Sequence, residues 1–262
     1  MGMRHICIVT AAVLAVSVAR AREPLVLTFT FDDATSDQMI AAAALEKYGW
    51  RGSFNVITAH VDRESAKPQA KEIGRPFTWA QCRDLVRRGH QVNSHSANHV
   101  NFQKLVKEGR MDEVRTEIAG SRDVIAKGTG RAPAFFCYPF VKGTKESDKA
   151  IVEAGMKPMT DLRIGFGGPC PQVPSAKPND PDGPNSFAKI AEKWYEDGVV
   201  ARDLMFHGID PKVGIWRPFA HPDDFEKNLP ALKELEKSGK IRVVGYDEFY
   251  AFAVAHRQAP KL

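Results

Sequence analysis

Residues 25–33 read Leu-Val-Leu-Thr-Phe-Thr-Phe-Asp-Asp and carry the clearest structural signal in the chain. Every residue before the two acids is apolar, aromatic or β-branched, which predicts a buried β-strand over 25–31. Two carboxylates, Asp32 and Asp33, follow this strand directly. Because α/β proteins bind ligands beyond the carboxyl ends of parallel strands, the acid pair marks a candidate functional site.

The chemistry of this acid pair has two interpretations. Two adjacent carboxylates repel each other when both are ionised, and a metal ion bound by one of them removes that cost. The other carboxylate then remains available as a general base. Alternatively, the pair forms an acidic turn that caps a helix, because Asp is common at helix N-caps. These residues alone leave both interpretations open.

Predicted strands and helices alternate along the rest of the chain, which favours an α/β fold with a largely parallel sheet. Further strands are predicted at 53–57, 91–93, 134–138, 157–162, 204–206 and 241–244. Helices are predicted from Thr35 or Ser36 to Lys47, from Thr78 to Arg87 with Gly89 after its end, and at 111–126, 145–154, 223–237 and 247–255. The Gly- and Pro-rich stretch 165–184 is predicted to be a long surface loop near the mouth of the site.

The first 21 residues have the pattern of a secretory signal peptide. Arg4 is followed by the uncharged apolar run 6–18 and by Ala19-Arg20-Ala21, a small-x-small cleavage pattern. The apolar run is too short to span a bilayer, which needs about 20 residues. We therefore expect a secreted or periplasmic protein without stable membrane insertion, whose residues 22–262 form a single catalytic domain.

Charge and cysteine content exclude several classes of protein. The formal net charge of +5 is modest, and no basic cluster with interleaved aromatic residues is present, so we expect no nucleic-acid partner. Of the 4 cysteines, Cys7 lies in the predicted signal peptide, which leaves Cys82, Cys137 and Cys170. At most one disulfide can form among these three, and no CxxC pair exists, so neither a disulfide scaffold nor a cysteine zinc site is expected.

Histidines supply two further candidate groups. His95 and His99, spaced i and i+4, would lie on one side of a helical turn and could hold one metal ion, although a capping or core role is the alternative. His207 ends an apolar strand and precedes Gly208; a lone histidine in such a place is usually structural. The remaining histidines are expected to be structural or exposed: His5, His60, His90, His221 and His256.

Taken together, the three groups provide two imidazoles and a carboxylate as ligands, with a carboxylate and an imidazole to spare. This is the composition of an open catalytic zinc site, in which three protein ligands leave a position for water. We therefore predict one divalent metal ion as cofactor. Zinc fits the ligand types, and cobalt or nickel would suit the same nitrogen and oxygen set.

The order of the motifs resembles the polysaccharide deacetylase family, the NodB-homology domain of carbohydrate esterases. That family carries T-F-D-D, H-[ST]-x-x-H, R-P-P-Y and L-x-H motifs in this order. Here they are matched by residues 30–33, 95–99, 137–140 and 205–207, and the resemblance covers about residues 25 to 250. It implies a distorted (β/α) barrel and a carbohydrate substrate.

The resemblance also implies residue roles. Asp32 would be the general base and His207 the general acid, while Asp33, His95 and His99 would hold the metal ion. The Pro139-Phe140 segment would meet the substrate, with the backbone N–H of Phe140 helping to hold the oxyanion, a role that does not need the hydroxyl of the family tyrosine.

Three departures from the family pattern stand out. Cys137 occupies the position of the arginine that braces the catalytic Asp, and a thiol cannot pair with a carboxylate as an arginine does. Met205 replaces the usual Leu, a tolerable apolar exchange. The family also carries an acidic or Trp-bearing motif between R-P-P-Y and L-x-H, which has no clear match here, and Asp161 is the nearest acid that could orient His207.

We consider three functions. The leading one is metal-dependent removal of N- or O-linked acetyl groups from a carbohydrate. The second is hydrolysis of another amide, such as a cyclic ureide, and the third is a secreted carbohydrate-binding relic of the fold. Asp32 and His207 argue against the relic, because binding alone needs neither, and the export signal favours an envelope polysaccharide over a cytosolic ureide.

Overall fold

The computed structural model describes residues 22–62, 75–159, 162–166, 186–210, 212, 219 and 221–258. The predicted signal peptide and most of the predicted loop 165–184 lie outside the described residues.

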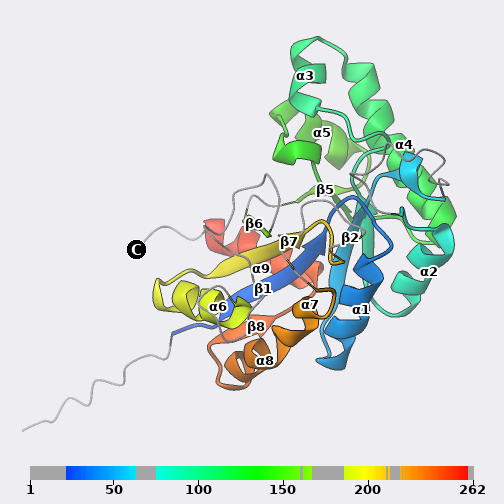
Figure 1. Ribbon diagram of the computed structural model, residues 1–262. Coiled ribbons are helices and arrows are strands. Elements are labelled where there is room, and N and C mark those ends of the chain that lie inside the picture. Colours follow the sequence, from blue (N-terminus) through cyan, green and yellow to red (C-terminus); the bar gives the residue numbers. More distant parts are fainter. Residues whose placement is uncertain are drawn as a thin grey trace, which may run out of the picture.

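A parallel β-sheet forms the centre of the molecule (Figure 1). In the described part of the chain its order is β5-β4-β3-β2-β1-β7-β6, with β8 beside β1, and every pairing between these strands is parallel. The strands are β1 (Leu25–Phe31), β2 (Gly52–Val56), β3 (Gln91–Ser94), β4 (Phe135–Phe136), β5 (Lys157–Pro158), β6 (Arg163–Phe166), β7 (Ala201–Phe206) and β8 (Ile241–Val243).

The pairing of β1 shows how the barrel is distorted. One edge of β1 pairs with β7 from Val26 to Phe31. The other edge is shared, because β8 pairs with its first three residues and β2 with its last three. The sheet therefore divides along this edge instead of continuing as a regular barrel. This half-barrel arrangement confirms the predicted distorted (β/α) barrel.

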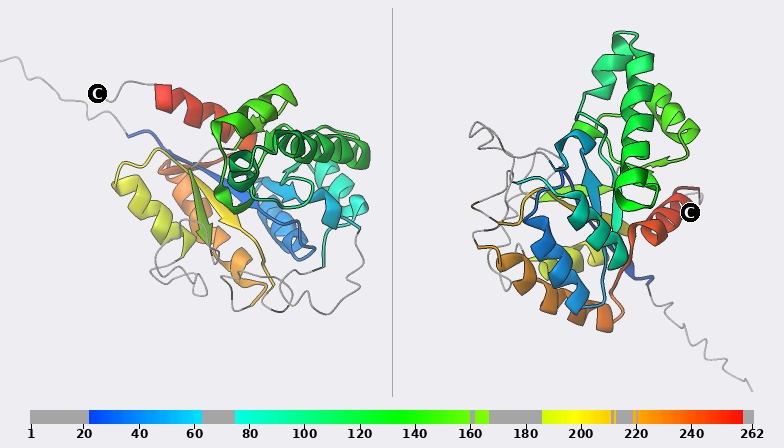
Figure 2. Two further views of the ribbon diagram at one scale, coloured as in Figure 1. Left: turned by 90° about the horizontal axis from the view of Figure 1, so that it is seen from above. Right: turned by 90° about the vertical axis from the view of Figure 1, so that its right-hand side faces the viewer.

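Helices cover the sheet, and α3, α4 and α5 project together beyond it at the top of Figure 1 (Figures 1 and 2). The helices are α1 (Gln38–Lys47), η1 (Thr58–His60), α2 (Trp79–Arg87), α3 (Phe102–Lys107), α4 (Met111–Thr129), η2 (Pro139–Val141), α5 (Lys145–Glu153), α6 (Phe187–Glu196), α7 (Asp224–Lys227), α8 (Leu229–Lys237) and α9 (Tyr246–Gln258). Within the described ranges, no helix combines the length and apolar character that crossing a bilayer requires.

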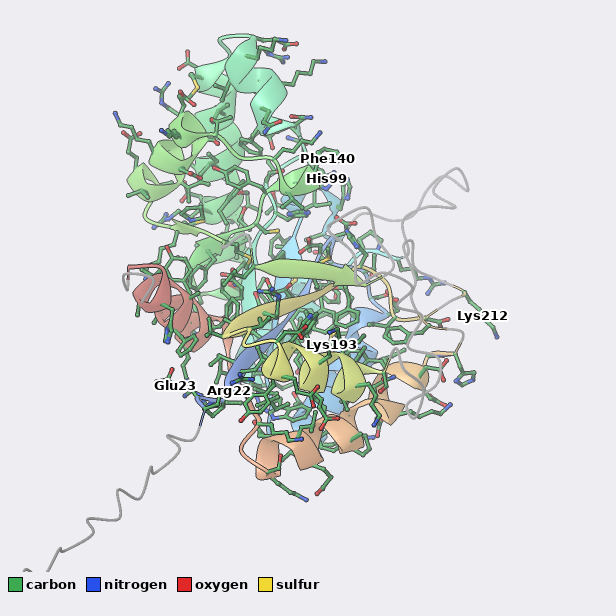
Figure 3. The ribbon with its side chains drawn as sticks, turned by 90° about the vertical axis from the view of Figure 1, so that its left-hand side faces the viewer. Arg22, Glu23, His99, Phe140, Lys193 and Lys212 are labelled. Carbon is green, nitrogen blue, oxygen red and sulfur yellow. The ribbon has the colours of Figure 1, made fainter. Side chains whose placement is uncertain are left out.

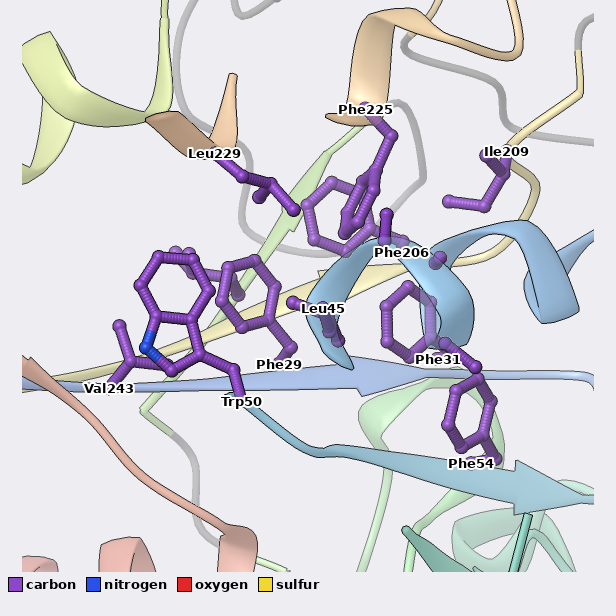
Figure 4. Packing of buried hydrophobic residues seen from close by; sticks show 14 of the residues in the cluster. Phe29, Phe31, Leu45, Trp50, Phe54, Phe206, Ile209, Phe225, Leu229 and Val243 are labelled. Atoms are coloured by element: carbon purple, nitrogen blue, oxygen red, sulfur yellow. The ribbon is translucent and has the colours of Figure 1, made fainter. Parts of the chain in front are cut away.

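The outer face of β1 is aromatic and carries the main core. Phe29 and Phe31 alternate with polar residues and are fully buried on this face. The ring centroid of Phe31 lies 4.8 Å from that of Phe54 on β2 and 5.6 Å from that of Phe206 on β7, in stacked contacts (Figure 4). The covering side chains come from the helices: Leu45 of α1, Phe187 of α6, Phe225 of α7, and Leu229 and Leu232 of α8. Burying each such side chain contributes about 1.5–3 kcal/mol.

The inner face of β1 changes character along the strand. Near its start, Val26 packs in an apolar cluster with Tyr246 and Phe249 of α9. Toward its carboxyl end the same face presents Thr30 and then Asp32, both buried. Both faces of β1 are therefore buried, although one is aromatic and the other becomes polar. The polar face ends at the acid pair, Asp32 and Asp33.

The inner face is joined by side-chain hydrogen bonds that run across neighbouring strands. Asn55 donates to Asp32 Oδ1 (2.7 Å), and Ser53 Oγ donates to Asn55 Oδ1 (3.4 Å). Asn93 of β3 donates to Ser53 Oγ (2.9 Å) and accepts from the backbone N–H of Phe135 (3.1 Å). We call Asp32, Asn55, Ser53 and Asn93 the inner polar chain. Because its members are buried, these bonds satisfy groups that would otherwise cost free energy to desolvate.

Several predicted elements agree with the structure. The strand over 25–31 has its predicted limits. Thr78 caps α2 in a reciprocal capping box with Gln81, and Gly89 follows the helix with a φ of 85°. These are segments whose local signals and tertiary contacts agree.

Other predicted elements were wrong. The strand predicted at 157–162 is short, ending at Pro158, and a separate strand, β6, begins at Arg163 and includes Gly165 and Phe166 of the predicted loop. The helices α3 and α6 were not predicted. The helix predicted at 223–237 is two helices, because Pro230 near the start of α8 cannot continue the hydrogen bonding of α7.

The predicted start of α1 was also wrong. Its N-cap is Asp37, not Thr35 or Ser36, and the Asp37 side chain makes no capping hydrogen bond to the helix. Instead, Asp37 Oδ2 accepts from the backbone N–H groups of Ile209 (2.6 Å) and Asp210 (2.9 Å). A long-range contact has replaced the local cap.

Candidate active site

The predicted site residues meet at the carboxyl edge of the sheet. Asp32 and Asp33 follow β1, His95 follows β3 and His207 follows β7. The parallel register aligns the ends of these strands, with Phe31 opposite Phe206 and Val56 opposite Ser94. Residues more than a hundred positions apart in the chain therefore gather at one edge.

Asp33, His95 and His99 form a group able to hold a metal ion. Asp33 Oδ1 lies 3.5 Å from His95 Nε2 and 3.6 Å from His99 Nε2. Two atoms bound tetrahedrally at about 2.1 Å from a zinc ion lie about 3.4 Å apart. Asp33 Oδ1 is buried without a hydrogen-bond partner among the described residues, a costly state that a bound cation would relieve. The residues present therefore fit a divalent ion.

A second group, Asp32, His95 and Cys137, shares His95 with the first. The two nitrogens of the His95 ring distinguish the two groups. His95 Nδ1 lies 2.9 Å from the carbonyl oxygen of Cys137. Only a protonated Nδ1 can donate to a carbonyl, so this bond leaves the lone pair on Nε2, which faces Asp33. The geometry thus favours the group that contains Asp33 and His99.

The candidate ligands His95 and His99 lie in a loop, residues 95–99, which we call the ligand loop. The predicted helical turn was wrong, because Ser96 and His99 have φ values of 69° and 58° and the segment is not helical. Ser96 Oγ accepts from the backbone N–H of His99 (2.8 Å) and closes the loop. The two imidazole centroids still lie 4.9 Å apart, so the rings converge through loop geometry instead of helical spacing.

Glu117 of α4 holds the ligand loop in place. Its Oε2 accepts from the backbone N–H of Asn98 (2.8 Å), and its Oε1 accepts from the Asn98 side chain (2.7 Å). Glu117 is buried, so these charge-assisted bonds are shielded from water. This role could not be predicted from the sequence, because Glu117 looks like any other acid in a predicted helix.

The electrostatics suit Asp33 and His99 as ligands. Burial alone would raise the pKa of Asp33, but the close approach of His95 and the charges of His207, His95 and His99 outweigh it and lower the pKa. Burial, aided by the nearby His95, lowers the pKa of His99 to about 4. At neutral pH the carboxylate is therefore anionic and this imidazole neutral, the forms that bind metal.

His95 sits in acidic surroundings. Burial alone would lower its pKa, but Cys137, Asp32 and Asp33 together raise it well above the ordinary value. Surroundings that attract a proton in this way also attract a metal cation, which competes with the proton for Nε2.

Asp32 is 3% exposed and lies beside the metal group without belonging to it. Its Oδ1 accepts the bond from Asn55, and Cys137 Sγ lies 3.6 and 3.7 Å from its two oxygens. Cys137 therefore does contact the carboxylate, as a weak thiol donor that brings no positive charge. Asn55 was missed in the sequence, although a polar residue inside a predicted buried strand was a usable signal.

His207 also reaches the site. Its Nε2 lies 4.0 Å from Asp33 Oδ2, and the residue is buried. Asp161, the predicted orienting acid, lies outside the described residues. Asp203, four positions earlier on β7, is fully buried and its Oδ1 accepts from Thr30 Oγ1 (2.7 Å). Asp203 was not among the residues predicted for the site.

Phe140 lies at the mouth of the site, in η2 directly after Pro139. Its side chain is 52% exposed, and its ring centroid lies 4.6 Å from that of His99 (Figure 3). Its φ of 58° is unusual for a residue with a side chain and turns the backbone sharply. The segment predicted to meet the substrate thus carries an exposed aromatic ring beside a candidate metal ligand.

The family model for polysaccharide deacetylase matches residues 19–159. A search of curated proteins found no match. A family 4 acetyl xylan esterase from Clostridium thermocellum, in complex with a cobalt ion, shares 20% identity and a TM-score of 0.53, covering 86% of this chain and 90% of that chain. The chitin deacetylase from Colletotrichum lindemuthianum shares 16% identity and a TM-score of 0.55, covering 86% and 87%.

A CE4 family pseudoenzyme from Bacillus anthracis is similar to the same degree. It shares 13% identity and a TM-score of 0.57, covering 87% of this chain and 66% of that chain. At these identities the solved structures establish a shared fold only. An active enzyme and a pseudoenzyme can have this fold, so the side chains of the site must distinguish between them.

Proposed function

Because this chain belongs to the polysaccharide deacetylase family, we propose that it is a metal-dependent hydrolase that removes N- or O-linked acetyl groups from a carbohydrate polymer or oligomer. One observation carries the proposal. Asp33 Oδ1 faces two imidazole Nε2 atoms at 3.5 and 3.6 Å, while the adjacent Asp32 is held apart by Asn55. A binding protein would not need the separate carboxylate.

Asp33, His95 and His99 would hold the divalent ion, with zinc, cobalt or nickel suited to the set. When bound, such an ion polarises a carbonyl group and makes water more acidic. The cobalt ion in the Clostridium thermocellum esterase supports a metal in this fold but belongs to that protein.

Asp32 is proposed as the general base. It would take a proton from the water that attacks the acetyl carbonyl, while Asn55 and Cys137 contact its carboxylate. The bond from Asn55 keeps Oδ1 fixed, so Oδ2 is the oxygen better placed to accept the proton.

His207 is proposed as the general acid. The leaving amine or alkoxide must gain a proton as its bond to the acetyl carbon breaks, and an imidazolium has a suitable pKa near neutrality. The backbone N–H of Phe140 would donate to the oxyanion, and the exposed Phe140 ring would contact the sugar. These roles come from the family motifs matched in this chain.

The signal-peptide pattern of residues 1–21 supports action outside the cytoplasm. We therefore propose a secreted or periplasmic enzyme whose substrate is an envelope or environmental polysaccharide. Hydrolysis of a cyclic ureide or of another amide is the second candidate, since the same residues could serve it.

The experiment is a measurement of acetate release by the mature protein from acetylated xylan, chitin oligomers and peptidoglycan, with Asp32→Asn as the matched inactive control. We expect wild-type protein to release acetate from at least one substrate and Asp32→Asn to release almost none. Ring opening of a cyclic ureide without acetate release would support the second candidate. Metal binding without either activity would identify a relic.

A further inference from the structure

Gln38 joins the two residues proposed as base and acid. It is the first residue of α1 and is fully buried. Its Nε2 lies 2.6 Å from the backbone carbonyl oxygen of Asp32 and 2.6 Å from that of His207. One side chain therefore contacts both segments. Asp32 is 6 positions from Gln38 in the sequence, and His207 is 169 positions from it.

The position of this contact explains why an amide is needed. The ladder between β1 and β7 ends where the Asp32 N–H donates to the Phe206 carbonyl (2.8 Å). Beyond that point the Gln38 amide links the segments that follow β1 and β7. Two carbonyl acceptors require two N–H donors, and a carboxamide nitrogen carries two, whereas a carboxylate carries none.

Asp37 adds a second hold on the same segment. Its Oδ2 accepts from the backbone N–H groups of Ile209 and Asp210, just after His207. The start of α1 therefore binds the His207 segment at two places, the His207 carbonyl and the backbone N–H groups of Ile209 and Asp210. Neither Asp37 nor Gln38 has a hydrogen bond to the ligand loop among the described contacts.

We propose that Gln38 is a positioning residue that sets the separation of Asp32 and His207 across the bond to be broken. This inference rests on the proposed function. It assigns the spacing of base and acid to α1, and the placement of the metal ligands His95 and His99 to the ligand loop. A displacement of about 1 Å between reacting groups can lower a rate about 100-fold.

The test uses Gln38→Met, which keeps the volume and removes both donors. We expect kcat on a substrate with a poor leaving group to fall about 10- to 100-fold, with metal content and KM close to wild type. The defect should shrink on an activated aryl acetate, whose leaving group departs without a proton. In a His207→Ala background, Gln38→Met should add little to the defect, because the group it positions is gone.

Gln81→Met is the matched control, because Gln81 also stands in the first turn of a helix but its side-chain oxygen accepts from the Thr78 backbone N–H in a capping box. A merely structural role for Gln38 would lower the melting temperature and the folded fraction without this dependence on the leaving group. If Gln38→Met does not fold, Asp37→Asn is assayed in the same way and should show the same dependence.

The outcomes separate the two proposals. Acetate release by wild type but not by Asp32→Asn, with an unchanged kcat in Gln38→Met, would overturn the positioning role and leave the proposed function intact. Equal loss on both leaving groups would also overturn it. An inactive wild type would overturn the proposed function and, with it, the role of Gln38.

Discussion

The two faces of β1 differ in what they bury. The outer face places Phe29 and Phe31 against rings from neighbouring strands and helices. The inner face places Thr30 and Asp32 in a buried hydrogen-bonded environment. Because side chains alternate along a strand, one segment contributes to both the core and the site. The aromatic face can supply stability while the polar face is arranged for chemistry.

This division makes opposite predictions for the two faces. Changes at the polar face and the residues that extend it should alter metal binding or turnover with little effect on folding. Changes at the aromatic face should lower stability and leave the turnover of folded molecules nearly unchanged.

The largest effect is expected from His95→Ala at the polar edge. This variant removes the imidazole that faces Asp33 and should lose most of the bound metal together with acetate release. Metal analysis after mild purification is the measurement, and circular dichroism should show a folded protein. Full metal retention by His95→Ala and also by His99→Ala would refute the ligand assignment.

Asp32→Asn should keep the metal and lose turnover. An amide cannot accept the proton of the attacking water, and loss of one general base typically costs about 10²–10⁴ in rate. Metal content and kcat/KM are measured on the same sample. A kcat/KM near that of wild type would rule out Asp32 as the base.

Phe29→Ala tests the aromatic face. Phe29 is fully buried, and its ring centroid lies 6.0 Å from that of Phe225 and 6.3 Å from that of Phe206. Its truncation should lower the free energy of unfolding by about 3–5 kcal/mol, measured by denaturant titration. Turnover per folded molecule should stay near wild type. A fall in turnover as large as that of Asp32→Asn would show that the two faces are not separable.

Glu117→Gln should have the smallest effect of the four. It replaces one of the two carboxylate oxygens that accept from Asn98. Loss of a residue that supports the metal ligands typically lowers metal affinity about 10- to 100-fold. Metal titration measures the change, with Glu113→Gln on the same helix as the control, because Glu113 pairs with Arg110 at the surface. Equal affinities in the two variants would remove Glu117 from the support of the site.

The sequence predicted the parts of the site whose signals are local. The strand over 25–31 and its two acids follow from alternation and position, and the histidines at 95, 99 and 207 from motif order. Gln38 and Glu117, which hold the site in place from other elements, could not be found in this way. Gln38 contacts a carbonyl 169 positions away, and Glu117 supports a loop from another element, so neither has a local pattern.

Two errors have different physical causes. The ligand loop was predicted as a helical turn because i and i+4 spacing suits a helix, but the positive φ values of Ser96 and His99 have no signature in residue type. The helix α6 does have such a signature, since Phe187, Ala188, Ile190 and Ala191 are buried at helical spacing. It was overlooked beside a Gly- and Pro-rich stretch.

The most direct test of the metal site is removal and return of the metal in one preparation of the mature protein, with bound metal and acetate release measured at each step. We predict that the chelated protein stays folded and releases no acetate, and that activity returns as about one equivalent of zinc, cobalt or nickel binds. Undiminished acetate release by the metal-free protein would contradict a metal-dependent deacetylase held by Asp33, His95 and His99.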